Sequence, residues 1–257
     1  MLIDWTLIAL CGFAFLAGFI DAVVGGGGLI QVPALFVLRP DLSPATLFGT
    51  NKFSSIFGTA NASWQYGRKV ALPWRAIAVT ALTAFGFSFL GARAVSVLQP
   101  SALRPLILVM LVLVFLYTLW KKDFGALHAP RLTSSQQSLA GFATGALLGF
   151  YDGFFGPGTG SFLIFAFVGL FGFSFLVASA AAKLVNLATN TAALAWFIPT
   201  GHVLYRSAVP MAVCNIAGSW IGSQLAIRKG SGFVRVLFII VVAALIARMS
   251  YDQLHLG

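Results

Sequence analysis

Long apolar stretches, separated by short polar or glycine-rich segments, make up nearly the whole chain. The first stretch runs from Trp5 to Val24 and contains no charged residue before Asp21. An α-helix of about 20 residues reaches about 30 Å, the thickness of the hydrocarbon core of a membrane. The apolar positions do not alternate with polar ones, as they would in the strands of a membrane β-barrel. The pattern therefore predicts transmembrane helices.

Four consecutive glycines, Gly25 to Gly28, end this first helix, because glycine is a poor helix former. The apolar stretch that follows, Leu29–Leu38, has about ten residues and is too short to cross a membrane alone. We interpret Trp5–Leu38 as one discontinuous spanning element that is broken at the glycines. A full helix followed by a re-entrant half-helix is the main alternative.

The next predicted helix, Gly49–Tyr66, is polar along one side. Residues on this side recur at three- and four-residue steps and so share one helical face: Asn51, Ser54, Gly58, Asn61 and Gln65, with Lys52, Ser55 and Thr59 as an adjacent stripe. Further helices are predicted at Trp74–Leu98, Leu103–Trp120, Ser174–Phe197, Arg206–Ile227 and Phe233–Ser250. Ser138–Leu170 is predicted as an element built around a second glycine-rich segment, like Trp5–Leu38.

The chain repeats itself at an interval of 131 residues. The segment G-F-I-D-A-V-V-G-G-G-G-L-I-Q-V-P, residues 18–33, returns as G-F-Y-D-G-F-F-G-P-G-T-G-S-F, residues 149–162, and Lys183 follows Lys52 at the same interval. We predict an all-α transmembrane bundle of about eight spans. It consists of two homologous four-span repeats, residues 1–122 and 138–257, joined by a polar loop at 123–137. An even number of spans makes the repeats parallel, which we prefer, and an odd number would invert them.

Composition excludes a soluble protein. Of the 257 residues, 59% are hydrophobic and 9% are charged, and the mean hydropathy is +0.94. Soluble domains carry about 25% charged residues. We interpret the net charge of +10 as a signal of membrane orientation and not of nucleic-acid binding, because the basic residues lie mostly in short loops.

An eight-span count places more basic residues on the side of the termini than on the other side. The terminal side receives Arg68, Lys69, Arg75, Lys121, Lys122 and Arg131, and the opposite side receives Arg39, Arg228 and Lys229. The positive-inside rule then predicts cytoplasmic termini. The first apolar stretch leads directly into the Asp21 segment, so we expect no cleaved signal peptide.

Four charged residues are predicted at membrane depth: Asp21, Lys52, Asp152 and Lys183. Each would cost about 2.5–3.5 kcal/mol at the centre of a spanning helix. They are tolerable only if they are paired, hydrated or facing a cavity. Two salt bridges that merely fix helix packing are one interpretation. Their presence in both halves, beside glycine-rich segments, favours a path for a substrate or an ion.

The glycine-rich segments have three possible roles. A nucleotide-binding loop is excluded, because no G-K-S or G-K-T follows them. Close packing of helices is possible, since small residues let helices approach. The third role is to break a helix near the membrane centre, so that a half-helix begins at Gly28 or Gly160. The positive N-terminal end of such a half-helix and its free N–H groups point inward and bind anions.

These residues together predict a site for a small anion. Lys52 and Lys183 supply positive charge, and the hydrogen-bonding groups come from Asn51, Ser55, Thr59, Asn186, Asn190, Gly27, Gly28, Gly158 and Gly160. Asp21 and Asp152 would repel an anion unless they are protonated or paired, and burial disfavours the charged form of a carboxyl group. We therefore expect these aspartates to couple transport to the proton gradient or to gate it.

Other chemistry finds no support in the sequence. Cys11 and Cys214 lie in apolar stretches without metal-ligand spacing, and we expect neither a metal nor a cofactor. His202 is predicted near a helix end, as an interfacial residue. No set of nucleophile and base is visible, so we do not expect an enzyme.

At these segments the chain resembles the sulfite exporter TauE/SafE family of membrane permeases. The resemblance includes the two glycine-rich segments, and also G-T-N-K-F-S-S-I-F-G-T-A and its partner S-A-A-A-K-L-V-N-L-A-T-N. It implies a secondary transporter of the bacterial inner membrane for small sulfur-containing or organic anions. Two features depart from the pattern: Pro157 and Thr159 interrupt the second glycine run, and Ala182 replaces the asparagine before the lysine.

We expect a transporter of sulfite, a sulfonate or a related anion, with export coupled to the proton gradient and the site at the interface of the repeats. A passive anion channel and a transporter of a carboxylate without sulfur are the alternatives. The lipid bilayer and the small anion are the expected partners. The sequence leaves open the oligomeric state and whether Asp21 pairs with Lys52 or with Lys183.

Overall fold

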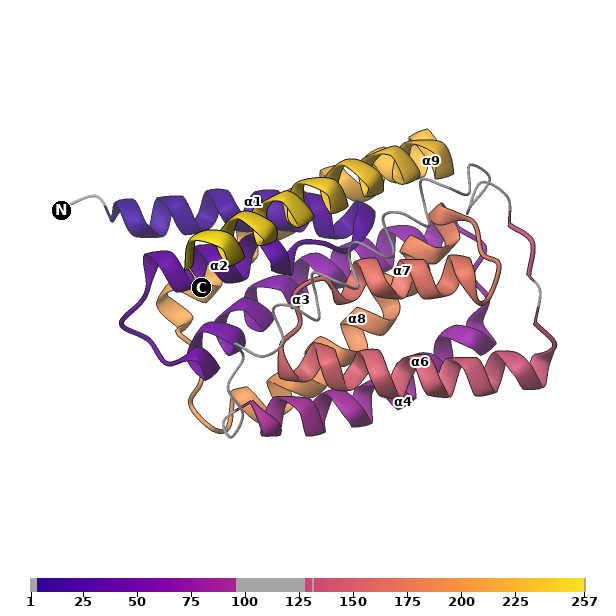
Figure 1. Ribbon diagram of the computed structural model, residues 1–257, viewed down its shortest axis with the longest axis horizontal. Helices are drawn as coiled ribbons and strands as arrows, with labels where there is room; N and C mark the ends of the chain where they lie inside the picture. Colours follow the sequence, from indigo (N-terminus) through magenta and orange to yellow (C-terminus); the bar gives the residue numbers. More distant parts are fainter. Residues whose placement is uncertain (1–3, 96–127, 131, 257) are drawn as a thin grey trace.

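The computed structural model describes residues 4–95, 128–130 and 132–256, and every regular element in these ranges is an α-helix. The helices are α1 (Trp5–Val24), α2 (Gly28–Leu38), α3 (Pro44–Lys69), α4 (Trp74–Ala94), α6 (Ser134–Phe154), α7 (Thr159–Gly169), α8 (Phe175–Phe197) and α9 (Tyr205–Leu256) (Figure 1). The all-α fold class is confirmed. The span expected at Leu103–Trp120 lies outside the described residues.

Side-chain caps explain where several helices begin. Ser43 caps α3 and is followed by Pro44, so this helix starts five residues before the predicted Gly49. Thr133 and Gln136 form a capping box at the start of α6. Because of this cap, α6 begins at Ser134, inside the segment that was predicted to be a loop up to residue 137.

The glycine run after α1 reverses the chain instead of continuing across the membrane. Gly25 adopts a left-handed conformation with φ of 76°, which ends α1. Gly27 lies against Ala17 of α1, and Leu35, near the other end of α2, packs in one cluster with Leu10. Helix α2 therefore folds back along α1, as Figure 1 shows. The discontinuous spanning element is wrong, and the re-entrant alternative describes this hairpin.

The long helices fall into two groups that run in opposite directions. Contacts advance together along α1 and α9 and along α4 and α6: Phe15 with Gly218 and Phe19 with Gly222, then Thr80 with Gly145 and Ser88 with Gly153. Helix α8 runs against α1, because Ser179 contacts Val23 while Lys183 contacts Asp21, nearer the start of α1. Helix α4 runs in the same direction as α8, because Ser88 contacts Thr189 and Arg93 lies over Trp196. Helices at the 131-residue interval, such as α1 and α6, thus run oppositely, and the prediction of a parallel orientation is wrong for the described helices.

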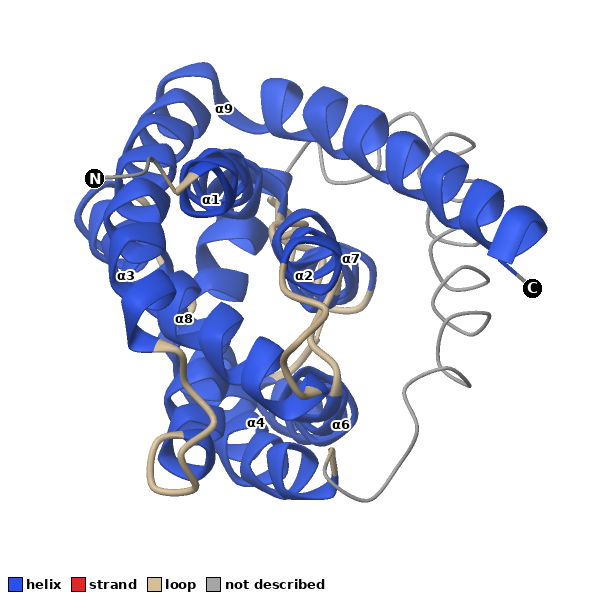
Figure 2. Ribbon diagram, turned by 90° about the vertical axis from the view of Figure 1, so that its left-hand side faces the viewer, coloured by secondary structure: helices blue, strands red, loops and turns tan. Residues whose placement is uncertain are grey.

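Glycines allow these helices to pack backbone against backbone. A side chain at Gly145 or Gly149 of α6 would overlap the backbone of α4, and one at Gly218 of α9 would overlap the backbone of α1. The end-on view in Figure 2 shows α4 beside α6. Such small-residue contacts are typical of helix pairs in membranes, where backbones must approach closely to gain packing energy.

Polar side chains are buried and many large apolar side chains are exposed, as lipid surroundings require. Leu82 and Trp5 are 76% and 72% exposed, whereas Lys183 and Thr189 are fully buried. Among the described helices, α1 and α4 are long and apolar enough to cross a membrane by themselves. Helix α9 is interrupted at Gly230, where the φ of 72° turns its second part back, and its two arms match the two last predicted spans.

Candidate functional site

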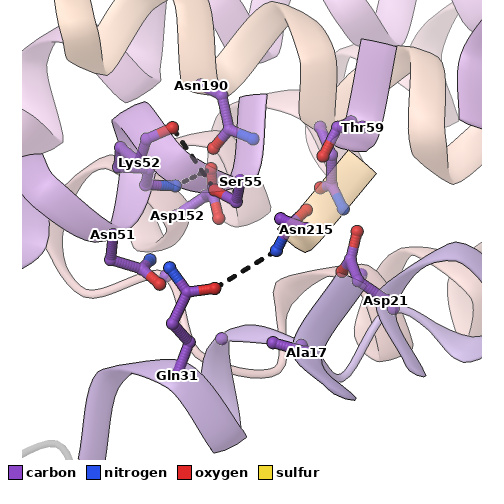
Figure 3. Close-up of a pocket in the computed structure, with 16 residues that line it drawn as sticks. Ala17, Asp21, Gln31, Asn51, Lys52, Ser55, Thr59, Asp152, Asn190 and Asn215 are labelled. Carbon is purple, nitrogen blue, oxygen red and sulfur yellow. Dashed lines mark hydrogen bonds and ion pairs between the residues drawn. The ribbon is translucent and has the colours of Figure 1, made fainter. Parts of the chain in front are cut away.

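A cavity of about 40 Å³ lies at the centre of the molecule, where α1, α2, α3, α6, α7, α8 and α9 meet. Most of the residues predicted to form the site line it: Asp21, Gly27, Gly28, Asn51, Lys52, Ser55, Thr59, Asp152, Gly160, Asn186 and Asn190 (Figure 3). Lys183 and Gly158 are not among the lining residues, and Gly158 packs against Leu29 and Phe162. The roles of these residues remain predictions.

The first of two central ion pairs joins α3 to α6. The Lys52 Nζ lies 2.5 Å from the Asp152 Oδ2, and the two side chains are 5% and 6% exposed. Both residues line the cavity. A ligand in the cavity can therefore reach the ammonium group and the carboxylate of this pair.

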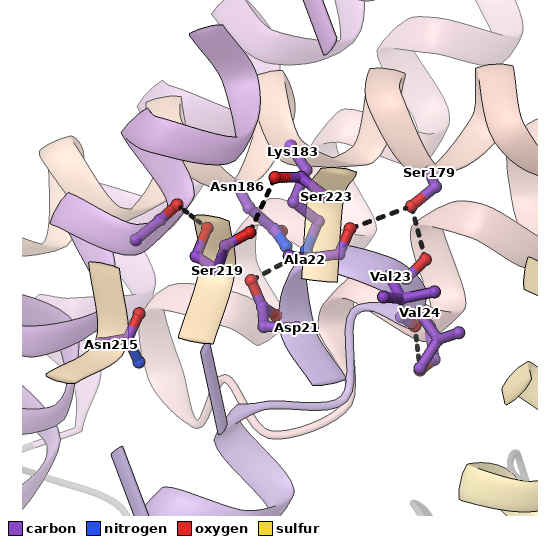
Figure 4. A network of polar contacts seen from close by, with 12 residues as sticks. Asp21, Ala22, Val23, Val24, Ser179, Lys183, Asn186, Asn215, Ser219 and Ser223 are labelled. Atoms are coloured by element: carbon purple, nitrogen blue, oxygen red, sulfur yellow. Dashed lines mark hydrogen bonds and ion pairs between the residues drawn. The ribbon is translucent and has the colours of Figure 1, made fainter. Parts of the chain in front are cut away.

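The second ion pair joins α8 to α1, with the Lys183 Nζ 2.8 Å from the Asp21 Oδ2 (Figure 4). The Lys183 side chain is fully buried, while the Asp21 side chain is 20% exposed. Each lysine thus pairs with the aspartate of the other half of the sequence, which answers a question that the sequence left open. The two pairs make the centre electrically neutral, so neither lysine offers unbalanced positive charge.

Hydroxyl groups bind the carbonyls at the buried end of α1, which have no partner within the helix. Three successive carbonyls accept these hydrogen bonds: Ala22 from Tyr66 at 2.8 Å, Val23 from Ser179 at 2.6 Å, and Val24 from Ser161 at 2.8 Å. The donors come from α3, α8 and α7. This satisfies a helix end at a depth where no water replaces missing hydrogen bonds, and it fixes Asp21 beside the cavity.

The two glycine-rich segments touch each other next to the cavity. A side chain at Gly25 would overlap the backbone of Gly160, and one at Gly160 would overlap that of Gly25. The close-packing interpretation of the glycines therefore holds at this contact. Because α2 begins at Gly28 and α7 at Thr159, the contact also brings the N-terminal ends of both short helices close to the cavity.

Gln31 and Asn215 also line the cavity, and sequence reasoning missed them. The Gln31 Oε1 accepts a hydrogen bond of 3.2 Å from the Asn215 Nδ2 (Figure 3). Each is a polar residue within an apolar stretch, and that signal could have found them. The internal repeat does not mark them, because the residues at the 131-residue interval are Phe162 and Ala84.

Three buried side-chain atoms of cavity-lining residues have no hydrogen-bond partner in the part of the chain that the structure describes. They are the Gln31 Nε2, the Asn51 Oδ1 and the Asn186 Oδ1. Buried polar atoms in proteins are nearly always paired. These three unpaired atoms therefore belong to residues of one cavity.

No group of three His, Cys, Asp or Glu residues that could hold a metal ion occurs among residues 4–95, 128–130 and 132–256. His202 lies in the exposed turn after α8, where its Nδ1 is 2.9 Å from the Thr200 Oγ1.

Comparison with known proteins supports membrane transport. Residues 10–249 match the family described as Sulfite exporter TauE/SafE. The chain is 35% identical over 251 residues to a Haemophilus influenzae protein named "Probable membrane transporter protein", covering 98% of this chain and 96% of the relative. It is 35% identical to the Escherichia coli K12 "Probable membrane transporter protein YfcA", covering 93% and 88%, and 23% identical to the Bacillus subtilis "Probable membrane transporter protein YunE", covering 86% and 87%. These are transporters and not enzymes, and the chain belongs to the sulfite exporter TauE/SafE family of membrane transporters.

Proposed function

We propose that the protein is a proton-coupled secondary transporter of a small anion such as sulfite or a sulfonate, with its site at the interface of two homologous inverted repeats. The observation that carries the proposal is the central cavity, where the Lys52–Asp152 ion pair meets the glycine-rich start of α2. The family points in the same direction.

Helix boundaries support the two repeats. Helices α2 and α7 have identical lengths, and both their first and last residues are separated by 131 residues. The starts of α3 and α8, at Pro44 and Phe175, and of α4 and α9, at Trp74 and Tyr205, keep the same interval. The opposite directions of these helices correspond to inverted repeats. The proposed units are residues 1–122 and 138–257, connected by 123–137.

Cavity size limits the substrate to a few heavy atoms. A single water needs about 10–15 Å³ measured in the same way, so about 40 Å³ holds about three waters. Sulfite, with four heavy atoms, is of this size. A sulfonate or carboxylate with a short chain would require the cavity to widen.

Neutrality of the site explains why transport would be coupled to protons. An anion can use the Lys52 ammonium fully only when Asp152 releases it. Protonation of Asp152 removes the competing carboxylate, and the ammonium and the N-terminal end of α2 then attract the anion. Anion and proton therefore favour each other's binding, and by linkage this effect is reciprocal.

Cooperative binding makes the direction of transport depend on both gradients. Anion and proton would cross together, so an inward proton gradient opposes export. Export then occurs when the outward concentration gradient of the anion exceeds the inward proton gradient that opposes it. This refines the expectation of coupled export: the accumulated anion supplies the driving force, and the proton is carried with it.

Basic residues support an orientation with the termini outside the cytoplasm, in the bacterial inner membrane. The expectation of cytoplasmic termini placed Arg68 and Lys69 on the terminal side. Helix α3 runs parallel to α1, because Leu47 packs in one cluster with Leu10 while Tyr66 contacts Ala22. These basic residues therefore lie at the end opposite the N-terminus. The positive-inside rule assigns the end that carries these basic residues to the cytoplasm, and both termini then lie on the other side. Reporters of cytoplasmic location that are fused to either terminus should therefore give no signal.

The decisive test is sulfite flux into proteoliposomes that contain the purified full-length protein. An imposed gradient, acidic outside, should drive sulfite inward beyond its equilibrium concentration, and Lys52→Met should abolish this accumulation. Protein-free vesicles correct for permeation of the neutral acid. Flux without uphill accumulation would indicate a passive channel. Absence of sulfite flux, with flux of a sulfonate or a short carboxylate, would replace the substrate and keep the mechanism.

A further inference from the structure

The first turn of α2 carries a buried amide donor that no described residue satisfies. Gln31 is 1% exposed, it lines the cavity, and its Nε2 has no hydrogen-bond partner among the described residues. We infer that the Gln31 Nε2 donates a hydrogen bond to an oxygen of the substrate, an inference that rests on the proposed transport of a small anion. We infer further that Asn215 is the positioning residue that holds this amide in place.

Hydrogen bonds from Asn215 determine which end of the Gln31 amide faces the cavity. The Asn215 Nδ2 donates to the Ala14 carbonyl at 3.1 Å and to the Gln31 Oε1 at 3.2 Å. Turning the Gln31 amide over would bring two NH₂ groups together, so its oxygen stays on Asn215. The NH₂ group then has no partner among the described residues, and Figure 3 shows it on the side of Asn51, which also lines the cavity.

Donor groups from α2 gather on one side of the cavity. Gly27 and Gly28, at the start of α2, line the cavity together with Gln31. The first N–H groups of a helix have no partner within it, and their partial positive charge attracts anions. A buried amide donor beside such a helix end provides both hydrogen bonding and favourable charge for an oxyanion.

The α7 side of the cavity lacks this arrangement. The residue that corresponds to Gln31 there is Phe162, and the one that corresponds to Asn215 is Ala84. Lys52 lines the cavity, whereas Lys183 does not. The substrate oxyanion therefore binds asymmetrically, between α2 and Lys52, although each half supplies a lysine and an aspartate.

Replacement of Gln31 by Met tests the donor, because Met has similar length and no N–H group. In proteoliposomes, Gln31→Met should raise the KM for sulfite about tenfold to a hundredfold, the value of a hydrogen bond to a charged group. Maximal flux should change less than about threefold, since the interaction is made in the ground state as well. Gln31→Leu provides a second apolar variant if Gln31→Met folds poorly.

Gln65→Met is the matched control. Gln65 is also buried, at 5% exposure, and its Nε2 also lacks a partner among the described residues, but it does not line the cavity. Its replacement should leave the KM unchanged. Equal increases in KM for Gln31→Met and Gln65→Met would overturn the inference, because they would reflect a general loss of packing.

Asn215→Ala tests the positioning role. It should raise the KM in the wild-type background and have no further effect in the Gln31→Met background, since its action passes through that amide. Additive effects would reject the positioning role. Wild-type flux with an unchanged KM in Gln31→Met would reject this inference alone. No flux of sulfite, a sulfonate or a short carboxylate by the wild-type protein would reject the proposed function together with the inference.

Discussion

The two central ion pairs have the same chemistry but different surroundings. Lys52 and Asp152 are both nearly buried and both line the cavity. Lys183 is fully buried and does not line the cavity, whereas its partner Asp21 is 20% exposed and does. Duplicated charges in a sequence thus need not have equal roles, because the depth of each lysine decides whether a ligand can reach it.

We propose that the Lys52–Asp152 pair takes part in transport, whereas the Lys183–Asp21 pair only fixes helix packing. Buried ion pairs are weak stabilisers compared with apolar packing, and breaking one by removing a single partner costs about 3–5 kcal/mol. A pair that only fixes helix packing can therefore be replaced by neutral residues at small cost. A pair whose lysine binds the substrate cannot be replaced by neutral residues without loss of transport, even if the replaced protein is stable.

Neutral replacement of each whole pair should give the largest difference between them. Lys52→Met with Asp152→Asn should lower sulfite flux at least about a hundredfold, because an anion loses its only accessible ammonium partner among the described cavity residues. Lys183→Met with Asp21→Asn should retain flux within about tenfold. Both are compared in proteoliposomes at equal protein content. Equal loss in the two double variants would show that both lysines bind substrate.

Removal of one aspartate at a time should separate the pairs by stability and ligand response. Asp21→Asn leaves the fully buried Lys183 unpaired and should cost about 3–5 kcal/mol of unfolding free energy. Asp152→Asn leaves Lys52 facing the cavity, where an anion can replace the carboxylate. Sulfite at about a hundred times its Kd would then restore about 2.7 kcal/mol.

Thermal unfolding in detergent, with and without sulfite, measures this difference. The stabilisation by sulfite should be larger for Asp152→Asn than for the wild-type protein, in which the anion must first displace Asp152. If sulfite stabilised Asp21→Asn as much as it stabilises Asp152→Asn, the assignment of Lys183 to a structural pair would be contradicted.

The sequence predicted most helices but not the path of the chain between them. The bounds Trp5–Val24 matched those of α1, because the apolar stretch ends at a glycine run. A glycine run shows that a helix ends, but not in which direction the chain continues. At Gly25 a left-handed backbone conformation and packing against Gly160 reverse the chain, and neither follows from a hydrophobic pattern.

Most of the predicted site residues line the cavity, because polar side chains inside a membrane protein have few other places to lie. Asn51 and Lys52 share the polar side of α3, and the pattern alone indicated that this side faces inward. Gln31 and Asn215 were missed because neither is repeated at the 131-residue interval, although each stands out as a polar residue in an apolar stretch. The pairing of Lys52 with Asp152 depends on the packing of α3 against α6, which a sequence without contact information does not determine.

Glycine substitutions compare the centre of the molecule with its surface at the same backbone conformation. Gly25 and Gly201 have φ angles of 76° and 74°. At Gly201 nothing lies within 4 Å of an added Cβ, so Gly201→Ala should cost about 1–2 kcal/mol for the left-handed conformation alone. Gly25→Ala should cost more than about 3 kcal/mol, because its Cβ would also overlap the Gly160 backbone.

Chemical or thermal unfolding of the two variants in the same detergent measures this second comparison. Gly25→Ala should also lower sulfite flux, since the contact between the glycine segments lies beside the cavity and precedes the start of α2. Similar stabilities for the two variants would mean that the glycine segments can move apart at little cost. The cavity could then widen for substrates larger than the volume of about three waters.

The exposed pair of Arg39 and Asp41 should give the smallest effect and serves as the reference for the buried pairs. The Arg39 Nε and Nη2 donate to the two Asp41 carboxylate oxygens at 2.9 and 2.8 Å, with Asp41 58% exposed. These hydrogen bonds lower the pKa of Asp41 from its ordinary value of 3.8. A lowered pKa in the folded state contributes stability above that ordinary value, and the contribution is lost as the pH falls through the lowered pKa.

Asp41→Asn should therefore lower the Tm slightly at pH 7, by about 1 °C or less, because solvent screens exposed ion pairs. The difference from the wild-type protein should shrink as the pH falls below 3.8 and through the lowered pKa, because the carboxyl group then becomes protonated in both folded and unfolded states. Scanning unfolding from pH 3 to pH 7 measures both. A Tm decrease at pH 7 as large as that of Asp21→Asn would mean that burial is not what distinguishes the central pairs, and the contrast between Lys52 and Lys183 would then need a cause other than depth.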